Sequence, residues 1–276
     1  MIKIGDKVVT PSTLRTEQQW TDVQLEIIGR MAASPIVFSY PDTGHFRFEL
    51  TLRNHIVGAA GALNYSGVSF ATFKESRCNE ELWRLTDFGG FRIRENVRPS
   101  DGIRDIYRNG RKYAFECATA MVIVYYRAVL ASIDEGAFNR LFADMLLYDW
   151  HYDKDLGLTT IEETVHLPGD VVYFKNPDVN PDTPEWQGEN AVVMREGLYY
   201  GHGIGIVGAR EIIRHLNNER RPGAVRSAFM MEGAARPDFA YLYRFRPGAP
   251  AGMTPIRRSR YDRIIARIGS AYYEIG

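Results

Sequence analysis

The stretch AFECATAMVIVYYRAVLASI, residues 114–133, decides the fold. It is apolar on nearly every face of a helix, which is typical of a helix buried in a core and not of one lying on a surface. It follows Asn109-Gly110 and ends at Asp134-Glu135-Gly136, where charged and turn-forming residues interrupt the pattern. We therefore predict a buried helix over these residues.

Before this helix the chain has mostly helical patterns. Apolar spacing predicts one helix over residues 13–31 and a second over 46–63. Helix-like turns are predicted over 79–87. The segment 92–109 is predicted to be rich in loops, with Pro99 as a helix start.

After residue 144 the pattern changes to short β-type runs broken by turn residues, at 171–174, 191–194, 198–200 and 205–207. Residues 195–197 predict a hairpin between two of them. A helix is expected over 209–218, a last strand over 240–245 and a short helix in the arginine-rich tail at 256–269. Helices first and antiparallel strands later predict an α+β single domain, because no linker is long enough to separate two domains.

Composition excludes several classes of protein. The 34 basic and 34 acidic residues give a net charge of zero, and the chain is 45% hydrophobic. We therefore expect a soluble globular protein without affinity for nucleic acid or an anionic membrane. The start, MIKIGDKVV, lacks the features of a signal peptide, and the longest apolar run, 118–126, is too short to cross a bilayer. Synthesis in the cytoplasm is the expectation.

The two cysteines, Cys78 and Cys117, are expected to be free thiols in that reducing compartment. No second cysteine cluster is available for structural zinc, and the histidines lack metal-ligand spacing, so we expect no metal and no cofactor. Cys117 lies in the first turns of the buried helix. The positive field of a helix N-terminus can lower a thiol pKa, and its backbone N–H groups can stabilise an oxyanion. Taken alone, the same cysteine could simply fill the core.

Two further residues favour a catalytic role for Cys117 over simple core packing. Glu189 begins one predicted strand, and His202 ends its hairpin partner. A cysteine on a helix that faces a histidine and a carboxylate on antiparallel strands is the papain-like arrangement of nucleophile, base and orienting group. Alone, His202 could be a structural histidine in a glycine-rich turn, and Glu189 a solvated charge at a strand end.

Four separated motifs resemble, in order, a known family. They are YAFECATA (113–120), LPGDVVYFKNPDVNP (167–181), TPEWQGENAVV (183–193) and GLYYGHGIGI (197–206). The resemblance is to the small calcium-independent transglutaminases of spore-forming bacteria, and it extends to about residue 246. It implies a minimal cysteine-peptidase-like core with helices packed on a small antiparallel sheet. We place the transglutaminase domain at 1–247 and a basic tail, expected to pack on the same domain, at 248–276.

The resemblance implies the activity and its residues. The expected reaction joins glutamine and lysine side chains of protein substrates through a cysteine thioester, in spore-coat assembly. Cys117 corresponds to the nucleophile, Glu189 to its partner carboxylate, Glu116 to a possible stand-in and His202 to the strand histidine. Neighbours on a helix point about 100° apart, so we expect Glu116 to orient the helix terminus and Glu189 to be the working partner.

A thioester that must meet an amine instead of water needs a dry site. Trp150, Trp186, Phe70 and Tyr173 are candidates for an aromatic wall that holds the methylene groups of glutamine and lysine. Ordinary core packing is the alternative for Phe70 and Tyr173.

Two alternative functions remain open. The first would use the same catalytic residues, and the second would use no catalytic residues. One is a papain-like amidohydrolase or peptidase with water as the acceptor, and the other is a non-catalytic coat protein. The segment GIGIVG (203–208) matches a dinucleotide fingerprint but follows antiparallel strands, and 153–157 has calcium-like acids out of register. We set both aside.

Overall fold

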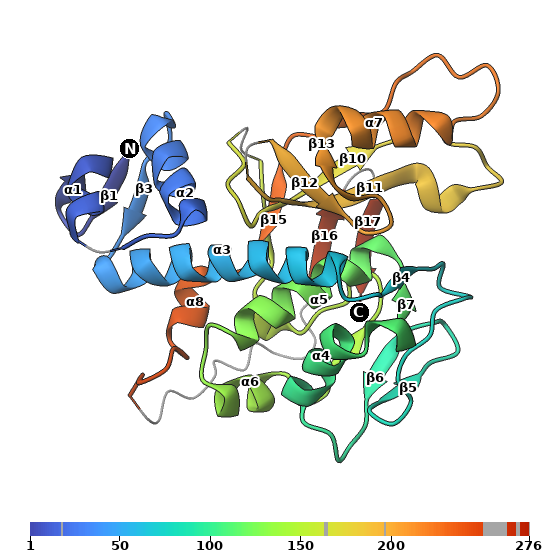
Figure 1. Cartoon of the computed structure of the whole chain (residues 1–276), viewed down its shortest axis with the longest axis horizontal. Helices are drawn as coiled ribbons and strands as arrows, with labels where there is room; N and C mark the ends of the chain where they lie inside the picture. Colours follow the sequence, from blue (N-terminus) through green and yellow to red (C-terminus); the bar gives the residue numbers. More distant parts are fainter. Residues whose placement is uncertain (18, 163–164, 196, 251–263, 269–270, 276) are drawn as a thin grey trace.

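Helix α5 (Cys117–Leu130) crosses the middle of the molecule beside the long helix α3 (Thr43–Asn64) (Figure 1). A computed structural model describes the chain except for residues 18, 163–164, 196, 251–263, 269–270 and 276. Almost every α5 residue after the first is buried, which confirms the prediction of a core helix. In α3 the buried side chains recur at helical spacing, for example Phe46, Leu50 and Val57.

The main sheet lies between α5 and α7 (Ala209–Asn218). Its strands pair antiparallel in the order β13-β12-β11-β10-β15-β9, with β14 also paired to β10. Alternate residues of a strand point to opposite faces. Val171 and Val192 therefore pack toward α5, while Val172 and Val193 pack toward α7. The strands of this sheet are β9 (Thr159–Ile161), β10 (Val171–Lys175), β11 (Gly188–Val193), β12 (Leu198–Gly201), β13 (Gly205–Gly208), β14 (Phe229–Met230) and β15 (Ala234–Arg236).

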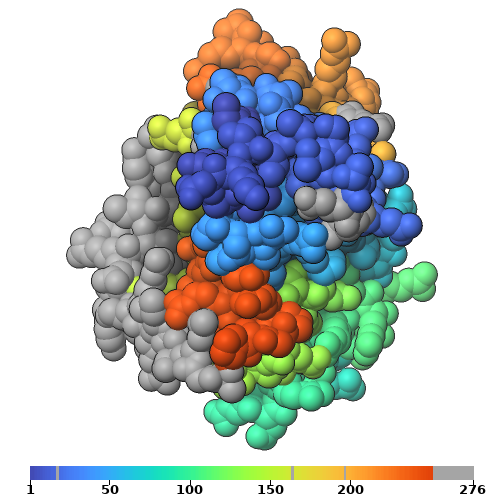
Figure 2. Space-filling view, turned by 90° about the vertical axis from the view of Figure 1, so that its left-hand side faces the viewer, coloured from blue at the N-terminus to red at the C-terminus, as the bar shows by residue number. Residues whose placement is uncertain are grey.

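Smaller sheets surround this centre. An N-terminal sheet in the order β2-β1-β3 packs with α2 on the first half of α3, and a second sheet has the order β5-β6-β8. Figure 2 shows the N-terminal segment and the region around α8 on one face, with α3 between them. The remaining elements are β1 (Ile2–Ile4), β2 (Lys7–Val9), α1 (Pro11–Glu17), α2 (Asp22–Ala33), β3 (Phe38–Tyr40), β4 (Ser69–Phe70), β5 (Trp83–Leu85), β6 (Phe91–Ile93), α4 (Pro99–Arg108), β7 (Ala114–Phe115), α6 (Glu135–Leu141), β8 (Leu146–Leu147), α8 (Phe239–Tyr243), β16 (Ile264–Ile268) and β17 (Ala271–Ile275), with short 3-10 turns at Gly110–Lys112, Lys154–Leu156 and Pro184–Gln187.

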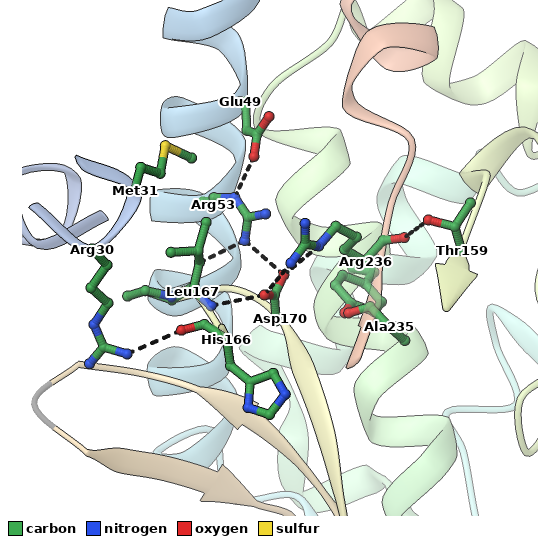
Figure 3. A network of polar contacts seen from close by, with 12 residues as sticks. Arg30, Met31, Glu49, Arg53, Thr159, His166, Leu167, Asp170, Ala235 and Arg236 are labelled. Atoms are coloured by element: carbon green, nitrogen blue, oxygen red, sulfur yellow. Dashed lines mark hydrogen bonds and ion pairs between the residues drawn. The ribbon is translucent and has the colours of Figure 1, made fainter. Parts of the chain in front are cut away.

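A buried ionic network ties α3 to the sheet (Figure 3). Arg53 donates from Nη1 to Asp170 Oδ1 at 2.8 Å and from Nε to Glu49 at 2.8 Å. Arg236 of β15 holds both oxygens of Asp170, at 2.9 and 2.7 Å. Arg53 and Asp170 are fully buried, while the side chains of Glu49 and Arg236 are 12% and 13% exposed. The network fixes the helix against the residue that precedes β10.

The structure corrects four sequence predictions. The predicted helix 13–31 is two helices, because Thr21 forms a capping box with Gln24 and starts α2. Of the helix-like turns predicted over 79–87, one hydrogen-bonded turn is present, with Trp83 N donating to Asn79 O at 3.0 Å, and β5 follows it in place of further turns. The predicted strand at 240–245 is wrong, since α8 occupies Phe239–Tyr243. Of the predicted tail helix, residues 264–268 form β16, while 256–263 and 269 lie outside the described residues.

Four other predictions hold. The helix expected at 46–63 is α3, the strands expected between 171 and 207 are β10 to β13, the helix expected at 209–218 is α7, and a helix starts at Pro99. The segment 92–109 is less rich in loops than predicted, because β6 ends at Ile93 and α4 covers Pro99–Arg108. Mixed helix and sheet around one core confirms the α+β class. None of the helices in the described ranges is long and apolar enough to cross a membrane.

Candidate active site

Cys117 is the first residue of α5, and one residue, Glu116, separates it from β7. Strand β7 pairs in parallel with β4, which fixes the approach of the chain to the helix. Glu116 is the N-cap residue, with extended backbone, and its carboxylate accepts from Ala118 N at 2.6 Å and Thr119 N at 2.5 Å. Glu116 therefore satisfies donors that a helix start leaves unpaired. These two N–H groups, which the sequence offered as oxyanion donors, are occupied by Glu116.

Asn190 contacts the thiol of Cys117. Asn190 was not among the site residues predicted from the sequence. Its Nδ2 donates to Sγ at 3.5 Å, while its Oδ1 is buried without a partner among the described residues. Asn190 faces the Cys117 side because it alternates with the sheet residues that pack toward α7. A polar side chain at the start of an otherwise apolar strand, next to Glu189, was the signal available in the sequence.

Glu189 is only 1% exposed, and its Oε1 has no hydrogen-bond partner among the described residues. The carboxyl lies against Gly201 on the neighbouring strand, where an added Cβ would come within 2.8 Å of Oε1. A glycine at 201 therefore makes room for it. Burial, and then the charge of Glu116, raise the pKa of Glu189 well above its ordinary value, against a backbone hydrogen bond from His202 that lowers it.

The pKa of the Cys117 thiol is raised, which overturns the expectation that the helix terminus lowers it. Burial is the largest cause, and the charges of Glu189 and Glu116 add to it, while hydrogen bonds from Asn190 act in the opposite direction. Two carboxylates near a thiol disfavour the thiolate more than one helix terminus favours it. The resting thiol therefore needs a base to remove its proton.

Both ring nitrogens of His202 have partners other than the thiol. Nε2 lies 3.1 Å from the carbonyl oxygen of Phe115, and Nδ1 lies 3.1 Å from the hydroxyl of Tyr200. Burial lowers the pKa of His202 to about 4, so the ring is neutral near pH 7. A carbonyl can only accept, so Nε2 carries the hydrogen and Nδ1 accepts from Tyr200. His202 thus anchors the strand that leads into Cys117.

A cavity of about 510 Å³ opens at Cys117. Three of the four aromatic residues singled out in the sequence line it, namely Phe70, Trp150 and Tyr173. Trp186 is not in the lining but stacks on Phe70, with ring centroids 5.5 Å apart and planes at 23°. Glu189 and His202 are not among the residues that line the cavity either.

Charged groups in the lining are mostly acidic. Glu116, Asp149 and Glu185 border the cavity, and Lys74 is the lining's basic residue among those described. Burial, opposed by hydrogen bonds from Thr119 and increased by the charge of Asp149, raises the pKa of Glu116 to about 6. Within the described residues no group of three or more histidine, cysteine or acidic side chains is placed to hold a metal ion.

A family model, related sequences and a solved structure all match this chain to one family. The model of the family described as "Protein-glutamine gamma-glutamyltransferase" matches residues 1–246. Proteins of that name from Bacillus cereus and Bacillus mycoides are 42% and 41% identical to this chain, each over 98% of both lengths. A solved transglutaminase from Geobacillus stearothermophilus, without its C-terminal extension, is 52% identical with a TM-score of 0.72, covering 75% of this chain and 99% of that one.

Proposed function

Because this chain belongs to the protein-glutamine gamma-glutamyltransferase family, a family of acyltransferases, we propose that Cys117 is its nucleophile and Glu189 its proton-transfer partner. The proposal rests on one observation: the thiol of Cys117 lines the cavity, and the charge of the buried Glu189 carboxyl, which has no ion-pair partner among the described residues, acts on it. A raised pKa makes the Glu189 carboxylate a stronger base toward the thiol.

The proposed reaction has two stages. Glu189 takes the Cys117 proton, and Sγ attacks the carboxamide carbon of a substrate glutamine. The C–N bond breaks, and Glu189 returns the proton to the departing nitrogen, which leaves as ammonia. A lysine amine then attacks the thioester, the C–S bond breaks, and the proton lost by the amine restores the thiol through Glu189.

We propose that the remaining site residues position the reacting groups or line the cavity. We propose that Glu116 holds the start of α5 through its two N–H contacts, and that His202 positions the Phe115 carbonyl. Phe70, Trp150 and Tyr173 line the cavity and would exclude water from the thioester, while Trp186 supports Phe70. A papain-like relation between α5 and the sheet is consistent with these positions.

The setting we propose is the one that the resemblance implies. The substrates would be coat proteins with reactive glutamine and lysine residues, cross-linked without calcium during spore formation. The match over residues 1–246 supports a catalytic domain of about that extent, with the segment after 247 as a tail.

Incubating the protein with a glutamine-containing peptide and a labelled primary amine tests the proposal. We expect amine incorporation and ammonia release together, both absent in Cys117→Ala. Ammonia release without incorporation would instead identify an amidohydrolase. Absence of both, with a Cys117 thiol that fails to react with alkylating reagents in the native protein, would identify a non-catalytic coat protein.

A further inference from the structure

Asp149 has an unusual backbone and position in the wall of the Cys117 cavity. Among the described residues it is the one non-glycine residue with positive φ, at 49°. It lies in a tight turn closed by a 2.8 Å hydrogen bond from His151 N to Tyr148 O. The next residue, Trp150, is anchored in the core and also borders the cavity. The hydrogen-bonded turn and the buried Trp150 therefore place Asp149 in the cavity wall.

Asp149 has no cationic partner among the described residues, although it is half-buried. Glu116 borders the same cavity, and the Asp149 charge acts on it. Lys74 is exposed and forms no ion pair with either in the described chain. Uncompensated carboxylates beside aromatic walls favour a cation more than they would in open water.

A second, independent feature points to a ligand with N–H donors. Asn190 is 5% exposed and borders the cavity, and its buried Oδ1 has no donor. A buried acceptor without a donor is unfavourable by about 1–3 kcal/mol until a ligand supplies one. Near Cys117 the cavity thus presents acceptors from Asp149, Glu116 and Asn190, and a primary ammonium carries three donors.

We propose that Asp149 binds the primary ammonium of the acyl acceptor, with Asn190 Oδ1 as a further acceptor for its N–H groups. The inference rests on the proposed function and adds a basis for choosing the second substrate. The methylene chain of a lysine would lie along Trp150 and Tyr173, which border the same cavity. A cationic acceptor gains the contact with Asp149, and an uncharged acceptor does not.

The test compares two acceptors in Asp149→Asn. Asparagine has nearly the same shape and tolerates a left-handed backbone, so the turn should be kept. One acceptor is a labelled cadaverine, which is cationic at neutral pH, and the other is hydroxylamine, which is not. We expect the ratio of the cadaverine KM to the hydroxylamine KM to rise on the order of tenfold, the loss of one partly buried charge contact.

The matched control is Glu75→Gln, which removes one exposed negative charge near Lys74 but outside the cavity lining. Its KM ratio should stay within about twofold of the unchanged protein's. An unchanged ratio in Asp149→Asn, or an equal shift in Glu75→Gln, would overturn the assignment. If Asp149→Asn shows no melting transition, Asp149→Glu is measured in its place. This variant keeps the charge, so its ratio of the cadaverine KM to the hydroxylamine KM should remain close to that of the unchanged protein. Failure of the unchanged protein to release ammonia from the donor peptide would instead refute the proposed function.

Discussion

Asp170 and Glu189 are both carboxylates buried in the same core, at 0% and 1% exposure, and their surroundings are opposite. Asp170 accepts from two arginines and from Leu167 N at 2.9 Å. Burial alone would raise its pKa, but Arg53 and Arg236 outweigh burial and lower it. Glu189 has no arginine beside it among the described residues, one oxygen without a hydrogen-bond partner, and a raised pKa. The first carboxylate is ionised and structural, and the second has the surroundings expected of the proton-transfer group that we propose.

The presence or absence of a counter-ion separates a structural buried acid from one that is suited to a reaction. A buried charge that is paired and fully hydrogen-bonded holds elements together, whereas a buried carboxyl without a counter-ion destabilises the fold and is retained for another reason. The charge of Glu189 acts on the thiol of Cys117, which is consistent with the proton transfer that we propose for it. Substitutions in the two carboxylate clusters should therefore have different effects.

The largest effect is expected in the reactive cluster itself. Cys117→Ser should abolish amine incorporation while leaving the melting temperature nearly unchanged, because a hydroxyl is a far weaker nucleophile than a thiol near neutral pH. The measurement is the incorporation rate with a glutamine peptide, alongside a melting curve.

Cys78→Ala is the matched control. Cys78 is half-buried away from the cavity, and burial, followed by the charge of Glu80, raises its pKa to about 12. Its loss should leave the incorporation rate within about twofold, as for a substitution away from any special site. Comparable loss of activity in both variants would show that the nucleophile has been misassigned.

Glu189→Gln should lower the incorporation rate by about 100- to 10,000-fold, the usual contribution of a general acid–base group. The amide keeps the shape and loses the proton-accepting oxygen. The free energy of unfolding should be unchanged or higher, because the variant loses a buried carboxyl that has one unpartnered oxygen and no ion-pair partner among the described residues. Rate and urea midpoint are measured on the same preparation.

Glu116→Gln separates the two candidate carboxylates. It disturbs one of two capping contacts, so a stability loss of about 1 kcal/mol and a smaller loss of rate are expected. An inactive Glu116→Gln together with a normal Glu189→Gln would exchange their roles.

In the structural cluster the expected effect is on folding. Asp170→Asn removes the carboxylate shared by Arg53 and Arg236 and leaves the buried Arg53 with Glu49 as its ion partner, so it should destabilise the protein by about 3–5 kcal/mol, measured by urea unfolding. The control is Glu211→Gln, which breaks an exposed pair with Arg214 and should change the free energy of unfolding by less than about 1 kcal/mol. Similar midpoints for both variants would mean that Asp170 does not stabilise the fold as its contacts suggest.

The sequence predicted the parts of the fold whose patterns are long or strongly apolar. Helix α5 followed from its apolar character, and β10 to β13 from β-type runs between turn residues. Helix α8 was predicted as a strand because aromatic residues alternate there. In the structure Tyr241 and Phe245, four apart, pack edge to face at 5.2 Å, as helical neighbours do. Strand β5 was missed because its hairpin partner β6 lies beyond a turn at Gly89.

The sequence predicted which residues form the candidate site better than it predicted their contacts. The positions of Cys117, Glu116 and Glu189 follow from their motifs, and the structure brings their charges within reach of one another. Contacts of Asn190 and the backbone of Asp149 could not be read from the sequence, because they depend on strand register and on one turn. The pKa of Cys117 was expected to fall because the sequence indicates the helix terminus but not the depth of burial.

The smallest expected effect concerns His202 and pH. Its pKa is about 4 when folded and about 6.5 when unfolded, so above pH 6.5 both states are neutral and the histidine adds no pH dependence. Between pH 6.5 and 4 the unfolded chain binds a proton that the folded chain does not bind, so the free energy of unfolding falls with falling pH, by about 3 kcal/mol at most.

His55 and His151 also have lowered pKa values and act in the same direction, so the contribution of His202 has to be measured by comparison with a variant. In His202→Gln, urea unfolding at pH 7 and pH 5 should show a shallower acid loss than in the unchanged protein, together with lower stability at pH 7, because the Phe115 carbonyl and Tyr200 hydroxyl lose a well-placed partner. Parallel pH profiles for the two proteins would show that His202 titrates normally and is not the buried neutral anchor inferred from its contacts.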